Sequence, residues 1–166
     1  SKGILPAGNP KDHYIDPHIR TSVTNVRIMV KNILVIMLKE DPENGTYYKQ
    51  RAANFLQELN AMDLRFKKSL KNIPSRTFLI YHPTLTYFAR DYRLKQIAIE
   101  KEDKEPSPFS LQETLNECLR SRVKIIFLQK QFDIKNTMLI ASQLHAQIFV
   151  FDPLAYNWPV MMNSVV

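Results

Sequence analysis

Two side chains of types that could take part in chemistry lie where strand-like segments end. His82 follows the run TFLIY and Asp152 follows the run QIFVF, and a proline comes directly after each of them. Because proline biases the preceding residue toward an extended backbone, both side chains are held at a strand exit. Glu100 and Gln129 follow the other two strand-like runs. Ligands of open parallel sheets bind at the carboxyl ends of the strands, so we expect His82 and Asp152 to share one rim.

A third segment of this kind is DPHIR, in which His18 precedes an apolar helix pattern. Two imidazoles and one carboxylate suit a divalent transition metal, above all zinc. Zinc takes about four ligands, and His18, His82 and Asp152 would supply three of them. Histidines in loops and at strand ends are also often only hydrogen-bonded, and DP is common in turns. Residue spacing alone therefore leaves both a metal site and a structural role open.

The apolar patterns predict the elements that must position these residues. Four β-branched and aromatic runs alternate with helical patterns between residues 77 and 151, and the first of these helices is expected over residues 83–92. Strands that alternate with helices at this spacing indicate an α/β fold, a four-stranded parallel sheet with helices on both faces. Ser110, with Glu113 three residues later, predicts the start of one of these helices, in which Cys118 should be a small buried residue. His145 lies between a helix and a strand at the opposite rim, where a structural role is expected.

A long helix is predicted to precede the sheet. Asp41 offers an N-cap and Pro42 a first helical position, and an apolar stripe then runs from Tyr48 to Leu70 in steps of four and three. A helix of about 26 residues would be about 39 Å long, which is longer than most globular helices. Such a helix is typical of a rigid spine.

A shorter helix over residues 23–40 is predicted ahead of it, with Thr24 or Asn25 near its N-cap. It is apolar nearly all round, which is typical of a helix inside a larger body. The rest of the chain offers little protein to cover its second side, so we expect a partner lobe outside this chain. Without that lobe, the exposed apolar surface from Ile28 to Leu38 is expected to promote dimers or a rearranged amino-terminal end.

Composition limits the classes of protein that fit. The 166 residues include 45% hydrophobic and 23% charged side chains, as is ordinary for a soluble globular protein. The formal charge is +7, but the basic residues are scattered without an aromatic-interleaved stripe, so we expect no nucleic-acid partner. A single cysteine excludes an intramolecular disulfide and a thiolate metal cluster. The start does not resemble a signal peptide, and no apolar run reaches the roughly 18–20 residues of a membrane span.

In their order along the chain, these segments resemble one protein family. The motifs are DPHI, DPEN, HPTLTYFARDY, EPSP, IIFLQKQF and DPL, which together span residues 16–158. They resemble the metal-binding subunits of bacterial zinc and manganese ABC importers, which are solute-binding proteins with two lobes joined by one rigid helix. The resemblance implies three parts: a remnant of the amino-terminal lobe at 1–45, a linker helix at 46–73 and a carboxy-terminal α/β lobe at 74–166.

The resemblance also implies the ligands and the function. His18, His82 and Asp152 match metal ligands of the family, and a further histidine ligand would lie upstream of Ser1. The chain would then be a carboxy-terminal fragment that catalyses no reaction. In the whole protein, zinc would be captured in the periplasm or at the outer face of the membrane and delivered to the permease of an ABC importer. Histidine at position 82, where members have His or Glu, favours zinc over manganese.

Two positions depart from the family pattern. Arg20 stands in place of the usual Trp and would put a cation near the metal, and Gln129-Lys130 replaces the usual Glu-Pro. One alternative is therefore a degenerate member that acts as a non-metal interaction module. Another is a metallohydrolase, because three ligands and an open position resemble a catalytic zinc site, although no motif fixes Glu100 or Glu105 as a general base.

Overall fold

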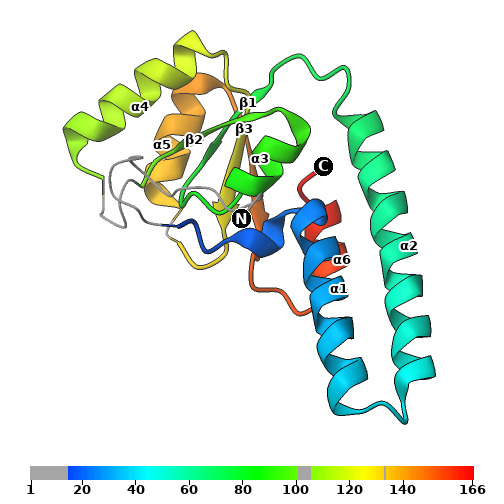
Figure 1. Ribbon diagram of the computed structural model, residues 1–166. Helices are drawn as coiled ribbons and strands as arrows, with labels where there is room; N and C mark the ends of the chain where they lie inside the picture. The colour runs from blue at the N-terminus through cyan, green and yellow to red at the C-terminus, as the bar shows by residue number, and fades with distance from the viewer. Residues whose placement is uncertain (1–14, 101–105, 133) are drawn as a thin grey trace.

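The computed structural model describes residues 15–100, 106–132 and 134–166 (Figure 1). Its elements are η1 (Ile19–Thr21), α1 (Val23–Glu40), α2 (Gly45–Ser69), β1 (Thr77–Ile80), α3 (Thr86–Tyr92), β2 (Lys95–Ala98), α4 (Pro108–Arg120), β3 (Ile125–Gln129), α5 (Lys135–Leu144), β4 (Gln147–Phe151) and α6 (Trp158–Asn163). Residues 1–14 of the expected amino-terminal part, and Glu105 of the EPSP motif, lie outside the described residues. The long helices α1 and α2 extend from the α/β lobe as a hairpin (Figure 1).

The four strands form one parallel sheet in the order β2-β1-β3-β4. Alternate residues of a strand face opposite sides of a sheet, and both sides are buried here. Phe78 and Ile80 join a core with residues of α1, α2, α3 and α6, while Leu79 joins a core with residues of α4 and α5. The predicted fold class, a four-stranded parallel sheet with helices on both faces, is confirmed.

Cys118 lies in the core between the sheet and helices α4 and α5. Its side chain is fully buried, and burial raises the pKa of the thiol to about 12. The thiol therefore stays protonated at neutral pH, and the predicted role as a small buried residue is confirmed.

Helix α1 occupies the predicted residues, but its cap differs from the prediction. Ser22, not Thr24 or Asn25, is the N-cap, and its hydroxyl accepts a hydrogen bond from the backbone N–H of Asn25. Val23 and Val26 in the first turns are buried in the core. None of the helices in the described residues combines the length and the apolar character needed to cross a membrane.

Helix α2 forms the predicted spine, with 25 residues. The expectation that Asp41 caps it and Pro42 begins it is wrong, because the helix begins at Gly45 with Asn44 as N-cap. Asp41 instead accepts hydrogen bonds from the side chains of Asn44 and Tyr48, and so closes the turn between α1 and α2. The same residue types therefore stabilise the turn that precedes the helix.

Two other helix starts were also predicted at the wrong residue. Ser107, not Ser110, caps α4, because Pro108 holds residue 107 in extended backbone and itself occupies the first helical position. Helix α3 begins at Thr86, three residues after Pro83, where the helical pattern was expected to start. Pro83 thus lies in the turn ahead of its helix, whereas Pro108 is itself the first residue of its helix.

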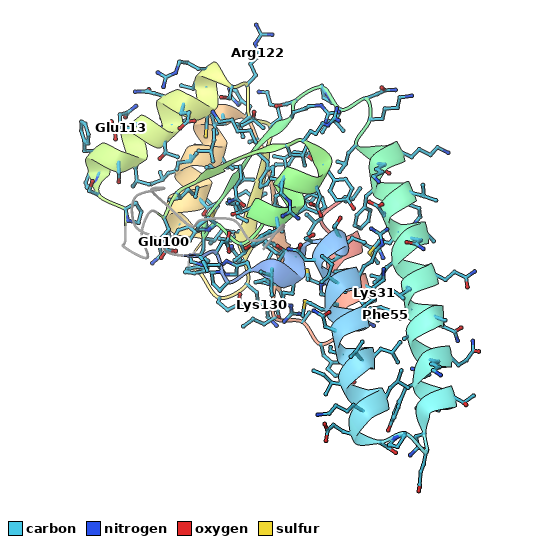
Figure 2. All side chains as sticks on the ribbon, in the orientation of Figure 1. Lys31, Phe55, Glu100, Glu113, Arg122 and Lys130 are labelled. Atoms are coloured by element: carbon cyan, nitrogen blue, oxygen red, sulfur yellow. The ribbon has the colours of Figure 1, made fainter. Side chains whose placement is uncertain are left out.

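A short helix that the sequence patterns did not indicate, α6, completes the core beside α1 and α2. Met161 and Met162 are buried in that core. The ring of Trp158 contacts the ring of Phe55, with centroids 6.5 Å apart, and Figure 2 shows Phe55 in the space between α1 and α2. The carboxyl end of the chain thereby packs against the helix hairpin.

Asp63 joins three helices through one nearly buried carboxylate. It accepts hydrogen bonds from Arg27 of α1 at 3.1 Å, from Lys67 of α2 at 2.8 Å and from the hydroxyl of Tyr92 of α3 at 3.0 Å. Burial by itself would raise the pKa of Asp63, but the hydrogen bonds from Lys67, Arg27 and Tyr92 outweigh burial and lower it. The sequence offered no sign of this junction, because two of its three partners, Arg27 and Tyr92, come from other helices.

Replacing Asp63 by Asn is expected to lower the free energy of unfolding by about 2 kcal/mol at neutral pH, because the amide cannot pair with the two cations. Since folding holds the pKa of Asp63 below its ordinary value of 3.8, the carboxylate's contribution is present above that value and is lost as pH falls below it. Urea denaturation should therefore show the gap between wild type and Asp63→Asn shrinking in acid.

The matched control is Glu58→Gln, an exposed site on the same helix, which should change stability by no more than about 0.5 kcal/mol at any pH. A gap for Asp63→Asn that stays constant from neutral to acid pH would contradict the assignment.

Candidate metal site

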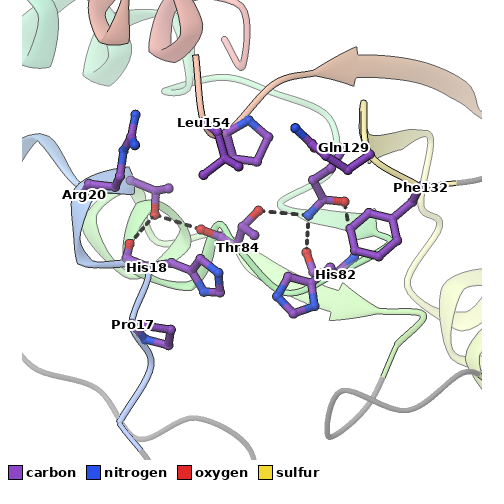
Figure 3. Close-up of a pocket in the computed structure, with 11 residues that line it drawn as sticks. Pro17, His18, Arg20, His82, Thr84, Gln129, Phe132 and Leu154 are labelled. Carbon is purple, nitrogen blue, oxygen red and sulfur yellow. Dashed lines mark hydrogen bonds between the residues drawn. The ribbon is translucent and has the colours of Figure 1, made fainter. Parts of the chain in front are cut away.

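The predicted ligands lie at the rim formed by the carboxyl ends of the parallel strands. Figure 2 shows Glu100 and Lys130, which follow β2 and β3, at one end of the lobe, and Arg122, which precedes β3, at the other. A pocket of about 410 Å³ opens at this rim. It is lined by the segment that leads into α1, by the exits of β1 and β3 and by the loop after β4 (Figure 3).

Asp16 holds His18 through two contacts. Its Oδ1 accepts from the backbone N–H of His18 at 2.8 Å and lies 2.8 Å from the ring Nδ1. Burial by itself would raise the pKa of Asp16, which is 3% exposed, but the hydrogen bonds from His18 outweigh burial and lower it. A carboxylate therefore stands behind this imidazole at neutral pH. The DPHI motif contained this partner, two residues before the histidine, although sequence reasoning assigned it no role.

His82 is held at both its ring and its backbone. Its Nδ1 lies 2.9 Å from Oε2 of Glu100, and the ring of Phe132 stacks on the imidazole with centroids 5.8 Å apart and an interplanar angle of 23°. The buried side chain of Gln129 accepts from the backbone N–H of His82 and donates to its carbonyl oxygen. Glu100 and Gln129 were noted in the sequence as strand-exit residues, and their contact with His82 follows from the sheet order.

The two imidazoles meet in the pocket. The ring centroids of His18 and His82 are 5.2 Å apart, with an interplanar angle of 77°. A zinc ion lies about 3 Å from the centroid of an imidazole that binds it, so two rings on one ion have centroids at most about 6 Å apart. A carboxylate at Nδ1 of each ring favours the tautomer with the proton on Nδ1, in which Nε2 is the nitrogen that carries the lone pair. The arrangement suits two nitrogen donors on one cation.

Asp152 follows β4 at the same rim, and its carboxylate contacts its neighbours. Oδ1 accepts from the side-chain amide of Gln131 and from the backbone N–H of Leu154, both at 2.9 Å. These hydrogen bonds, that of Gln131 above all, lower the pKa of Asp152. Within residues 15–100, 106–132 and 134–166, no three His, Cys, Asp or Glu side chains gather into a ready group of metal ligands. The role of Asp152 as a third ligand stays a prediction.

Arg20, the proposed obstacle to metal binding, lies at the edge of this pocket. Figure 3 shows its side chain directed away from the rings of His18 and His82. Its guanidinium donates to the backbone carbonyl of Ala155 at 3.3 Å, and its own carbonyl accepts from the indole N–H of Trp158 at 2.8 Å. Arg20 thus joins the segment that carries His18 to the segment after β4.

The carboxylate contacts predict the tautomer of both site histidines. At about pH 9, where histidine side chains are neutral, His18 and His82 should carry their proton on Nδ1. Long-range ¹H–¹⁵N NMR spectra distinguish the two tautomers. Replacing Glu100 by Ala should remove the preference at His82 and leave that of His18 unchanged, whereas an Nε2–H tautomer at His82 in the wild type would contradict the geometry.

Comparisons with known proteins agree with this fold. The family model described as ZnuA, zinc-uptake complex component A periplasmic, matches residues 1–165. The high-affinity zinc uptake system protein ZnuA of Bacillus subtilis (strain 168) is 29% identical over 144 residues, which are 86% of this chain and 45% of that protein. The zinc-binding lipoprotein AdcA of Streptococcus pneumoniae serotype 4 is 24% identical over 164 residues, which cover 91% of this chain and 33% of that protein.

A crystal structure of ZnuA matches with a TM-score of 0.90 and 34% sequence identity, over 99% of this chain and 64% of that one. Of the two curated relatives, ZnuA of Bacillus subtilis and AdcA of Streptococcus pneumoniae, the chain spans less than half the length. The family consists of solute-binding transport proteins rather than enzymes, which does not favour the metallohydrolase alternative. Because the family model matches nearly the whole chain, the chain belongs to the ZnuA family of zinc-uptake complex components.

Proposed function

We propose that this chain supplies two imidazole ligands to a zinc-capture site in a protein that delivers the ion to the permease of an ABC importer. The observation that carries the proposal is the pair of rings, His18 and His82, with centroids 5.2 Å apart and with a carboxylate at Nδ1 of each. Two nitrogen donors favour zinc over manganese. The zinc-uptake and zinc-binding names of the relatives from Bacillus subtilis and Streptococcus pneumoniae support the same ion.

The remaining ligands are proposed from the surroundings of the pair. Asp152 at the same rim supplies a carboxylate after release of its contact with Gln131, and a residue outside this chain or water completes the shell of about four. Binding weakens as pH falls, because the imidazoles must be neutral to coordinate. The ion is cargo, so an affinity that depends on protonation and on ligands from two segments allows both capture and release.

The chain is further proposed to be the carboxy-terminal part of a longer protein, with a remnant of the amino-terminal lobe at 1–45, the linker helix at 46–73 and the metal-presenting lobe at 74–166. Its coverage of 45% and 33% of the curated relatives supports a longer protein, and the position of α2 (Gly45–Ser69) ahead of the sheet supports the proposed division. The periplasmic description of the family and the lipoprotein name of one relative support a location in the periplasm or at the outer face of the membrane.

Isothermal titration with zinc tests the site directly. The wild-type chain should show weak but saturable binding of one ion, because part of the proposed site lies outside it, and His82→Ala should weaken that binding at least about tenfold, since even the loss of an outer partner costs about 10–100-fold. His145→Asn is the matched control, because His145 ends α5 at the other rim in left-handed backbone, φ 47°, which Asn tolerates.

Heat that does not saturate in the wild type, with its fold intact by circular dichroism, would contradict zinc capture and favour the non-metal interaction module. Equal heat in wild type and His82→Ala would remove His82 from the site. Titration with manganese in place of zinc should give weaker binding, because the two imidazoles favour the softer ion.

The apolar side chains of α1 support a second proposal about association. Ile33, Val35 and Ile36 are 56%, 67% and 59% exposed in this chain. An apolar surface of this kind marks an interaction site. We propose that two copies of the chain cover it by pairing their α1 helices when the amino-terminal lobe is absent.

Light scattering over a range of concentrations should therefore show a monomer–dimer equilibrium. Ile33→Lys combined with Ile36→Lys should shift it to monomer, whereas Leu64→Lys, at a residue 68% exposed on α2, should leave it unchanged. A monomer at every concentration would overturn the pairing.

A further inference from the structure

A chain of buried and partly buried hydrogen bonds connects the two histidines of the pocket (Figure 3). It begins at His82, whose backbone N–H donates to Oε1 of Gln129 at 3.3 Å and whose carbonyl accepts from Nε2 of the same amide. Nε2 of Gln129 also donates to the hydroxyl of Thr84 at 2.9 Å. The amide thus uses both its donor and its acceptor to hold the β1 exit against the end of β3.

The chain continues through Thr21 to His18. The hydroxyl of Thr21 lies 2.8 Å from the carbonyl oxygen of Thr84 and 2.9 Å from the carbonyl oxygen of His18. Its single hydrogen is shared between these two acceptors. One hydroxyl therefore bridges the segment that carries His18 and the segment that carries His82.

The three linking side chains are almost completely buried. Thr21, Thr84 and Gln129 are 1%, 3% and 1% exposed. A hydrogen bond in a buried network is stronger than one in water, and an unpaired polar group there is costly. Any shift of one histidine segment relative to the other would break at least one of these bonds, so the network opposes such a shift.

We propose that Gln129, Thr84 and Thr21 are positioning residues that hold the two imidazoles at their spacing in the metal-free protein. They act through the backbone of His18 and His82, since their hydrogen bonds go to the main chain of those residues and to one another. This inference rests on the proposed function for its consequence. Two imidazoles already held at the right separation bind zinc without the free-energy cost of bringing the rings together. It also assigns a use to Gln129, which stands where the resembled family usually has Glu, because a carboxylate cannot donate to the His82 carbonyl.

Thr21→Val tests the bridge, because valine keeps the shape of threonine and removes the hydroxyl. In the metal-free wild type, NMR should show ring-to-ring nuclear Overhauser effects between His18 and His82, as expected for centroids 5.2 Å apart. In Thr21→Val these effects should disappear, and zinc affinity should fall by about tenfold or more. Thr21→Ser retains the hydroxyl and should restore both signals.

Thr114→Val is the matched control. Thr114 is 1% exposed on α4, on the other side of the sheet, and its hydroxyl has no hydrogen-bond partner among the described residues. The substitution removes the same atom from an equally buried place and should leave both the ring-to-ring effects and zinc affinity unchanged. If Thr21→Val fails to fold by circular dichroism, the pair Thr84→Val and Thr84→Ser tests the hydrogen bond from Gln129 to the Thr84 hydroxyl, since both variants keep the Thr84 carbonyl that Thr21 contacts.

The two readouts separate the inference from the proposed function. Ring-to-ring effects that persist in Thr21→Val and Thr84→Val would overturn the positioning role, whatever the zinc affinity. Effects that disappear in the valine variants and return with serine support positioning even if the wild type binds no zinc, and in that case the proposed function fails. An equal fall in affinity in Thr114→Val would also overturn the inference, because the cause would then be general stability.

Discussion

Tyr87 of α3 donates a buried hydrogen bond of 2.9 Å to the backbone carbonyl of Asp16. This contact holds the segment that carries His18 against α3, and the candidate site depends on that docking. The hydroxyl of Ser22 adds a second contact to α3, donating to Asp91 at 2.5 Å. Together they fix the segment before α1 onto the helix that follows His82. Without this docking, the two imidazoles would belong to parts of the chain that are free to separate. The pocket, the ring spacing and the buried chain through Thr21 all follow from it.

The long helix α2 extends that constraint over the molecule. Its buried face, including Leu59, Met62 and Phe66, packs in the same core as α1, α3 and one face of the sheet. Asp63 in this face binds α1 through Arg27 and α3 through Tyr92. Apolar packing supplies the stabilisation. The nearly buried carboxylate of Asp63 restricts how the three helices can pack, because its hydrogen bonds to Arg27, Lys67 and Tyr92 must all form in the same arrangement.

The local charge of the pocket differs from that of the whole chain. The protein carries a formal charge of +7, yet carboxylates of Asp16 and Glu100 stand behind the two imidazoles. A cation in the pocket would experience these nearby groups more strongly than the scattered surface lysines, which are screened over about 10 Å by salt. Net charge is therefore a poor guide to the ligand proposed for this pocket, whereas the residues at the strand exits point to it.

Much of this protein could be predicted from its sequence because the relevant signals are local. Periodicity determined the four strands, both long helices and the fold class, since alternation and steps of three and four reflect backbone geometry directly. Proline after His82 and Asp152 marked the strand exits, and the order of the motifs identified the family. Tertiary structure alone decided the rest: that Glu100 backs the imidazole of His82, that Gln129 holds the backbone of His82, and that Arg20 points to the loop after β4. Each of these contacts depends on which segments the sheet order and the helix docking bring together, and no spacing along the chain encodes that proximity.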